Sequence, residues 1–154
     1  NNMVWALRRF PLFPVFGDGD YAVQPVHVED VAEAAVSAGH EDLDLTVSSV
    51  GPETFTYVEL VRLLARETGS RTALVHLRPG LALAATRLVG YAVRDVVMTR
   101  DEVAGLMAGL LVADTRPTVG KTRFSTWLSE NADDLGHRYR SELRRHYRVG
   151  TKRM

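Results

Sequence analysis

The side chains that perform acid–base, nucleophilic or metal chemistry show none of the usual catalytic or metal-binding spacings in this sequence. No two of the five histidines stand four positions apart, the spacing that places two imidazoles on one helix face for zinc. Gly-x-Ser-x-Gly, the strained turn that exposes a nucleophilic serine, is absent. The chain has no cysteine, which excludes thiol catalysis and cysteine-based zinc sites. We therefore predict no catalytic residue and no metal site in this chain.

One short stretch has the appearance of a phosphate-binding loop. Residues 120–122 read Gly-Lys-Thr and precede a helical pattern, as in a P-loop. The glycine needed five positions earlier is Thr115, and Pro117 removes a backbone N–H from the loop. Because backbone N–H groups are what cradle a phosphate, we interpret this match as chance.

The composition bounds the class of protein. The chain has 154 residues, of which 45% are apolar and 25% are charged, and its formal net charge is zero. These values predict one compact domain and argue against a protein whose whole surface binds polyanions. The charge is nevertheless uneven, since residues 10–61 hold ten acids and no Lys or Arg, whereas residues 121–154 hold nine basic residues and four acids. We favour the interpretation that these two regions face each other in the fold over a separate partner surface.

Basic and aromatic side chains alternate near the C-terminal end. Five arginines lie between positions 138 and 148, together with Tyr139 and Tyr147. Such a pattern can bind nucleic acid, but we favour a solvated helix face that forms salt bridges to the acidic N-terminal half. We therefore predict no nucleic-acid partner.

Periodicity and capping signals predict the elements that position these residues. Two capping boxes, Thr56 with Glu59 and Thr99 with Glu102, begin helices. A carboxylate at Glu29 or Asp30 is expected to start a helix whose small apolar face packs on a sheet. The predicted helices are 2–9, 29–38, 56–69, 79–93, 99–112, 121–131 and 135–147, and the predicted strands are 12–16, 22–28, 45–50 and 72–77. This order predicts a mixed α/β fold with few short strands and a mostly helical C-terminal lobe.

Residues 14–32 carry the most informative pattern. They read as a strand, a Gly17-x-Gly19 turn, a second strand, and Val28-x-Asp30-Val31-Ala32 at the start of a helix. This stretch resembles the C-terminal half of extended and atypical short-chain dehydrogenase/reductases (SDRs), the NAD(P)-dependent epimerase/dehydratase family. The residues from Gln24 to Val28 look most like those of the atypical branch related to the complex I accessory subunit. The segment 45–53 and the helix after Thr56 are also similar, so that the resemblance covers about residues 1–69 and is faint beyond.

The resemblance implies that much of the parent protein lies outside this chain. The chain begins Asn1-Asn2-Met3, and it contains neither the glycine-rich dinucleotide fingerprint nor a Tyr-x-x-x-Lys pair. We therefore expect residues 1–154 to be a single-domain fragment: residues 1–69 match the late-strand, substrate-cleft part of a Rossmann-type SDR, and residues 70–154 form a helical lobe. NAD or NADP would bind the parent on the absent N-terminal half, and we expect no cofactor-binding residue here.

In that family, the segment aligned with residues 24–27 lines the substrate cleft. Gln24 and His27 are therefore our candidate substrate-binding residues. Family members that bind sugar nucleotides often carry an arginine near this position, whereas Gln24 is followed by Pro25 here. The resemblance thus implies a small-molecule substrate less charged than a sugar-nucleotide diphosphate. The alternative is that His27 is a hydrogen-bonded structural residue of a strand.

Two functions remain open at this point. The first is the substrate-binding C-terminal part of an NAD(P)-dependent oxidoreductase or epimerase-like protein, inactive as a fragment. The second is a non-enzymatic module that binds a protein, lipid or quinone through the apolar helices of residues 81–112. The two hypotheses differ in one testable respect, which is whether a dinucleotide-binding half is encoded upstream of residue 1.

Location and assembly follow from the same patterns. The apolar run 103–113 is too short to span a bilayer, and Arg87 interrupts the run 81–93, so we predict no integral membrane segment. We expect a cytoplasmic protein, at most peripheral to a membrane. If strand 45–50 has lost its sheet neighbours, its exposed edge predicts a homodimer, an element swap, or renewed pairing within the chain.

Overall fold

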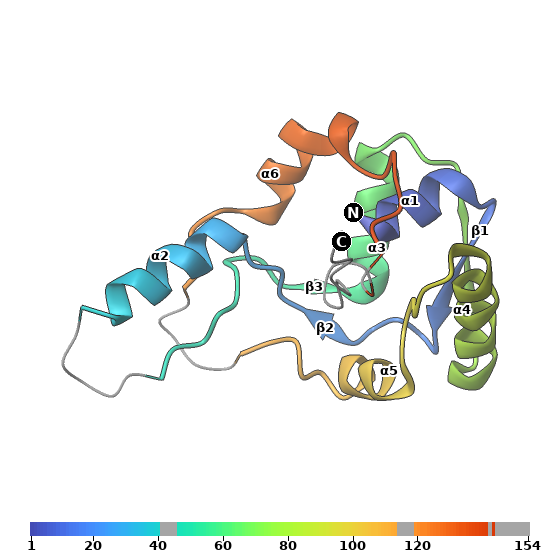
Figure 1. The fold of residues 1–154 in the computed structure, drawn as a ribbon, viewed down its shortest axis with the longest axis horizontal. Helices are drawn as coiled ribbons and strands as arrows, with labels where there is room; N and C mark the ends of the chain where they lie inside the picture. The colour runs from blue at the N-terminus through green and yellow to red at the C-terminus, as the bar shows by residue number, and fades with distance from the viewer. Residues whose placement is uncertain (41–45, 114–118, 142, 144–154) are drawn as a thin grey trace, which may run out of the picture.

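The computed structural model describes residues 1–40, 46–113, 119–141 and 143, and within them the fold is mixed α/β with short strands (Figure 1). Helices cover far more of the described chain than strands do. The elements are α1 (Asn2–Arg9), β1 (Leu12–Phe16), β2 (Ala22–Val23), α2 (Val28–Ala38), β3 (Phe55–Thr56), α3 (Tyr57–Glu67), β4 (Ala73–Leu77), α4 (Pro79–Val93), α5 (Arg100–Met107), α6 (Phe124–Asn131) and a short 3-10 turn (Ala132–Asp134). The predicted mixed class with few short strands is confirmed.

The strands pair in two separate two-stranded sheets. β1 and β4 run parallel, with Leu12 opposite Ala73 and Phe16 opposite Leu77. β2 and β3 are antiparallel, with Ala22 opposite Thr56. The described residues therefore hold no multi-stranded parallel sheet, because the two pairs do not join.

The main hydrophobic core of the molecule lies between α3, α1 and the β1–β4 sheet. Helix α3 buries an apolar stripe against them, and α6 adds Leu128, which is fully buried. The capping box predicted at the start of α3 is present: the Thr56 hydroxyl accepts from the Glu59 N–H, and the Glu59 carboxylate accepts from the Thr56 N–H. The buried apolar members of this cluster are Val4, Leu7, Phe13, Val15, Val23, Tyr57, Leu60, Val61, Leu64, Leu106 and Leu128.

A second, smaller core joins α4 and α5 to the end of β1. Phe16, Ala82 and Val103 are each almost completely buried there. The capping box Thr99–Glu102 begins α5 as predicted, although the helix ends at Met107 and not near residue 112. The turn after β1 is also as predicted, with Gly17 and Gly19 both at positive φ.

Helix α2 lies apart from the body that holds these two cores, at the left of Figure 1. We call the unit formed by α2 and residues 46–51 and 119–123 the α2 arm. The Ser48 and Val50 carbonyls accept hydrogen bonds from the Val119 and Gly120 N–H groups, which joins two of its segments. The closest backbone approach is at Gly51, where a Cβ atom would stand 1.8 Å from the Pro25 carbonyl oxygen, so only glycine fits.

Several predictions for this region were wrong. The small apolar face of α2 does not pack on a sheet, since the one buried residue of this helix is Asp30. The strand predicted over 22–28 ends at Val23, and residues 46–50 form no strand; Leu45 lies outside the described residues. The predicted sheet edge is thus missing over 46–50, and within the described chain the backbone pairs with residues 119–120 instead.

The first half of the helix predicted over 135–147 is also absent. Residues 135–141 are non-helical, and of the remainder the structure describes Leu143 alone. The reason is visible in the partners of this segment: the Asn1 and Asn2 side chains bond to the backbone at Gly136, Arg138 and Arg140, which draws it along α1. Such bonds compete with helical hydrogen bonds for the same backbone groups.

The expected pairing of the acidic and basic regions is seen in two ion pairs. Lys121 meets Glu33 at 3.0 Å, and Arg123 meets Glu53 at 2.6 Å. Each joins the lysine- and arginine-free stretch 10–61 to the start of the basic stretch. The uneven charge is therefore at least partly satisfied inside the molecule.

Candidate functional site

Gln24 lies directly after β2 and connects three segments of the chain. Its Nε2 donates to the Gly51 carbonyl at 2.7 Å, and its Oε1 accepts from the Ala113 N–H at 3.3 Å. Its backbone N–H also donates to the Leu111 carbonyl. A glutamine amide offers two N–H groups and two lone pairs, so one of each remains for a ligand.

His27 faces a different part of the molecule. It is the N-cap residue of α2 and makes no side-chain capping bond. Its ring is half-buried, with its centre 5.8 Å from that of Trp127 on α6. The two candidate residues, three positions apart, therefore point to different neighbours: Gln24 to residues 51 and 113, and His27 to α6.

The expectation that the Asp30 carboxylate caps the start of α2 is wrong. This carboxylate does not cap its own helix but accepts from the N–H groups of Lys121 and Thr122, both at 2.8 Å, and from the Thr122 hydroxyl at 3.0 Å. These bonds, led by that from the Thr122 N–H, hold the pKa of Asp30 below its ordinary value. They also explain the Gly-Lys-Thr stretch, since the amides that a phosphate would need already bind a carboxylate of the same chain.

Glu53 plays the same role at the start of α6. Its carboxylate accepts from the Ser125 N–H at 2.8 Å, the Ser125 hydroxyl at 2.7 Å and the Arg123 guanidinium at 2.6 Å. Burial raises the pKa of Glu53, but the bonds from Ser125 and the charge of Arg123 outweigh burial and lower it. Sequence reasoning missed this cap because acceptor and donor are 72 positions apart.

The region around Gln24, Asp30 and Glu53 therefore acts as a structural junction. Both carboxylates have lowered pKa values and are held as anions, which suits hydrogen-bond acceptors and not general acids. Among the described residues, no three His, Cys, Asp or Glu side chains gather in a way that could hold a metal ion. If a ligand binds here, it meets the spare amide groups of Gln24 or the His27 ring.

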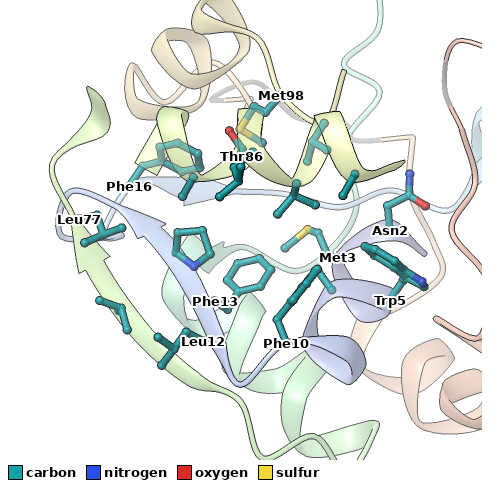
Figure 2. Close-up of a pocket in the computed structure, with 18 of the residues that line it drawn as sticks. Asn2, Met3, Trp5, Phe10, Leu12, Phe13, Phe16, Leu77, Thr86 and Met98 are labelled. Carbon is teal, nitrogen blue, oxygen red and sulfur yellow. The ribbon is translucent and has the colours of Figure 1, made fainter. Parts of the chain in front are cut away.

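An apolar cavity of about 700 Å³ lies elsewhere, between α4 and the β1–β4 sheet (Figure 2). One wall is the sheet with Phe13 and Phe16, the opposite wall is α4, and α1 with Trp5 closes one end. Phe13 is 8% exposed and Phe16 1%, whereas Leu12 on β1 is 58% exposed and Leu88 on α4 is 73% exposed. The cavity therefore runs from a buried floor to an opening between β1 and α4.

The tyrosines near the two cores are poor acids. Burial, and next the charge of Asp18, raise the pKa of Tyr21 to about 12. Burial likewise raises the pKa of Tyr57, whose ring lies 5.3 Å from that of Tyr21. A catalytic tyrosine of a dehydrogenase needs a lowered pKa, so neither residue fits that role, in agreement with the absence of Tyr-x-x-x-Lys.

Comparison with known proteins leaves the chain without an assigned relative. No protein-family model matches it, and no curated protein matches it. Among the described residues, every helix is too short or too polar to cross a bilayer. The resemblance to SDRs stays a prediction from the residues of the 14–32 stretch.

Proposed function

We propose that this chain is the substrate-side part of an NAD(P)-dependent oxidoreductase or epimerase-like protein of the SDR family, inactive by itself. The observation that carries the proposal is the exposed apolar surface of the α2 arm. Val28 is 74% exposed, Val36 63% and Val47 49%; the first two lie on α2, which begins inside the family-like stretch, and the third lies on the segment 46–51. We interpret these apolar side chains, exposed on a protruding element, as a surface that packs against a further layer.

In this proposal the further layer is the dinucleotide-binding half, which carries NAD or NADP. The parent would transfer a hydride between the nicotinamide and a carbonyl or alcohol carbon of a small substrate, in the cytoplasm. The chain described here supplies one wall of the cleft, with Gln24 and His27 as substrate contacts. Gln24 is well suited to this role because two bonds to the backbone fix its amide while one N–H and one lone pair stay available.

The test compares the 154-residue chain with the longer reading frame that contains it. We expect the longer protein to bind NADPH in a fluorescence titration and the 154-residue chain not to bind it. A folded longer protein that contains a glycine-rich turn and still binds no NAD(P)H would overturn the cofactor proposal. Gln24→Ala in the longer protein is expected to raise KM for the substrate more than it lowers kcat.

A second function is favoured by the exposed apolar residues of the C-terminal lobe. Leu88 and Tyr91 on α4 are 73% and 84% exposed, and Leu110 after α5 is 72% exposed. They suit a non-enzymatic module that binds a protein, lipid or quinone and lies at a membrane surface. Flotation with phosphatidylcholine vesicles tests it: this function predicts co-flotation of the chain, which Leu88→Ser with Leu110→Ser abolishes.

A further inference from the structure

The cavity between α4 and the β1–β4 sheet has the features of a binding site. We propose that it binds an uncharged small molecule with a hydrocarbon body and one hydrogen-bonding oxygen. The inference goes beyond the proposed oxidoreductase function, because every wall of the cavity belongs to the described chain and no cofactor half is needed. The argument rests on size, on polarity and on what keeps the cavity open.

The size of the cavity matches a ligand and exceeds a packing defect. Its volume of about 700 Å³ falls within the roughly 300–1,000 Å³ range of pockets that hold drug-sized molecules. Protein interiors are otherwise packed with few voids larger than a water molecule. Apolar voids of lesser size already bind small apolar molecules, since water gains few hydrogen bonds in them.

The lining excludes a charged ligand. No Asp, Glu, Lys, Arg or His is among the described residues that line the cavity. Burying an unpaired charge in such surroundings costs far more than burying a neutral group. A fatty alcohol, ketone or ester fits this lining, whereas a free carboxylate does not.

Most polar groups of the lining are already paired. The Thr86 hydroxyl donates to the Leu83 carbonyl at 2.9 Å, and the Tyr139 hydroxyl donates to Asp95 at 2.9 Å. The Asn2 amide exchanges two bonds with the Arg140 backbone. Tyr57 also lines the cavity, and its hydroxyl makes no hydrogen bond to another described residue. The proposal assigns this hydroxyl as the partner of the ligand oxygen.

Packing on one side of α4 holds the cavity open. Ala82, Thr86 and Gly90 form a buried stripe along this helix. Ala82 packs with Phe16 of β1 and Val103 of α5 in the smaller core, which fixes this side of the helix. With this stripe fixed, Ala85 and Ala92 face the cavity with side chains too small to fill it.

The experiment uses the 154-residue chain and the neutral fluorophore N-phenylnaphthylamine. We expect saturable fluorescence enhancement that dodecanol or methyl dodecanoate reverses, with dodecanoate at pH 8 at least about tenfold weaker as a competitor. Ala85→Phe fills the cavity and should weaken probe binding about tenfold. The matched control is Ala84→Phe, because Ala84 is the exposed neighbour on the same helix and does not line the cavity.

Two further variants keep the result decisive. Ala92→Phe replaces Ala85→Phe if circular dichroism shows that the latter does not fold. Tyr57→Phe should weaken competition by dodecanol about threefold to tenfold, by loss of one hydrogen bond, and leave probe binding unchanged. Absence of saturable binding, equal binding by the Ala85→Phe and Ala84→Phe variants, or equal competition by dodecanoate would overturn the proposal. The proposal would also be overturned if light scattering shows a dimer and the dimer releases the fluorescent probe. A second copy of the chain would then occupy the cavity.

Discussion

Helices α2 and α3 each have 11 residues, yet they are held in place by different forces. Five apolar or aromatic residues of α3 are buried, from Tyr57 to Leu64, whereas α2 buries Asp30 alone. Helix α3 is therefore fixed by apolar area removed from water, and α2 by hydrogen bonds that a carboxylate accepts from a distant backbone segment. The comparison teaches that α2 lies outside the apolar core: polar contacts join it to residues 121–122 within the arm, and the arm approaches the rest of the molecule closely where Gly51 meets Pro25.

The largest expected effect of a single change is in the body around α3. Leu128→Ala removes a fully buried side chain of α6 and should cost about 3 kcal/mol of unfolding free energy, through lost transfer energy and the cavity left behind. Urea denaturation followed by circular dichroism measures it. Leu110→Ala is the control, because Leu110 is 72% exposed and the same change there should be nearly neutral. Equal costs at the two positions would refute the assignment of the core.

A change at the base of the α2 arm should act locally. In Gly51→Ala, the new Cβ would stand 1.8 Å from the Pro25 carbonyl oxygen, so the backbone must move at a cost of about 2 kcal/mol. We expect faster amide hydrogen exchange in α2, with exchange in α3 unchanged. Gly80→Ala serves as control, since nothing lies within 4 Å of its added Cβ. If exchange in α3 accelerates equally, the arm and the body unfold as one unit.

Acid should loosen the α2 arm before the body. Because the folded-state pKa of Asp30 is lowered, its contribution is fully present above the ordinary aspartate pKa of about 3.9 and is lost as the pH falls through the lowered value. Asp30→Asn should therefore destabilise the arm at pH 7 and flatten this acid dependence. Exchange measurements between pH 2 and pH 6 test it, with Glu29→Gln as the exposed control. An unchanged acid profile in Asp30→Asn would show that other groups hold the arm.

The smallest effect is expected at the ion pair between Lys121 and Glu33. Both side chains are mostly exposed, at 77% and 65%, and solvent screens such pairs. Lys121→Gln should therefore leave the stability of the arm unchanged within error, because the Asp30 bonds use the backbone N–H of residue 121 and not its side chain. A large loss in this variant would mean that charge pairing, and not Asp30, joins α2 to residues 119–123.

Prediction from sequence succeeded where the partners of a residue are its neighbours in the chain. The capping boxes at Thr56 and Thr99 close on residues three positions later, and both are present. β1 appears over the predicted residues for a related reason, since a short apolar run between turn residues favours one extended conformation. The mixed α/β class follows from these local elements.

Prediction failed where a distant segment supplied the partner. Asp30 was expected to cap its own helix but binds residues 121–122, and residues 135–141 exchange helical bonds for bonds to Asn1 and Asn2. For the candidate site, Gln24 was found as a residue of interest, but its attachment to Gly51 and Ala113 could not be read from the sequence. No local spacing signals a partner 27 or 89 positions away.

The sequence by itself thus determined the two helix starts at the capping boxes, the β1 and β4 segments, the absence of thiol chemistry and the family-like pattern at residues 14–32. Tertiary structure alone decided that α2 lies outside the core, that Asp30 and Glu53 hold the start of α6, and that α4 stands away from the sheet over an apolar cavity. The physical reason is the range of the interactions. Capping and periodicity act within a few residues, whereas burial, long-range hydrogen bonds and cavities depend on which distant segments meet.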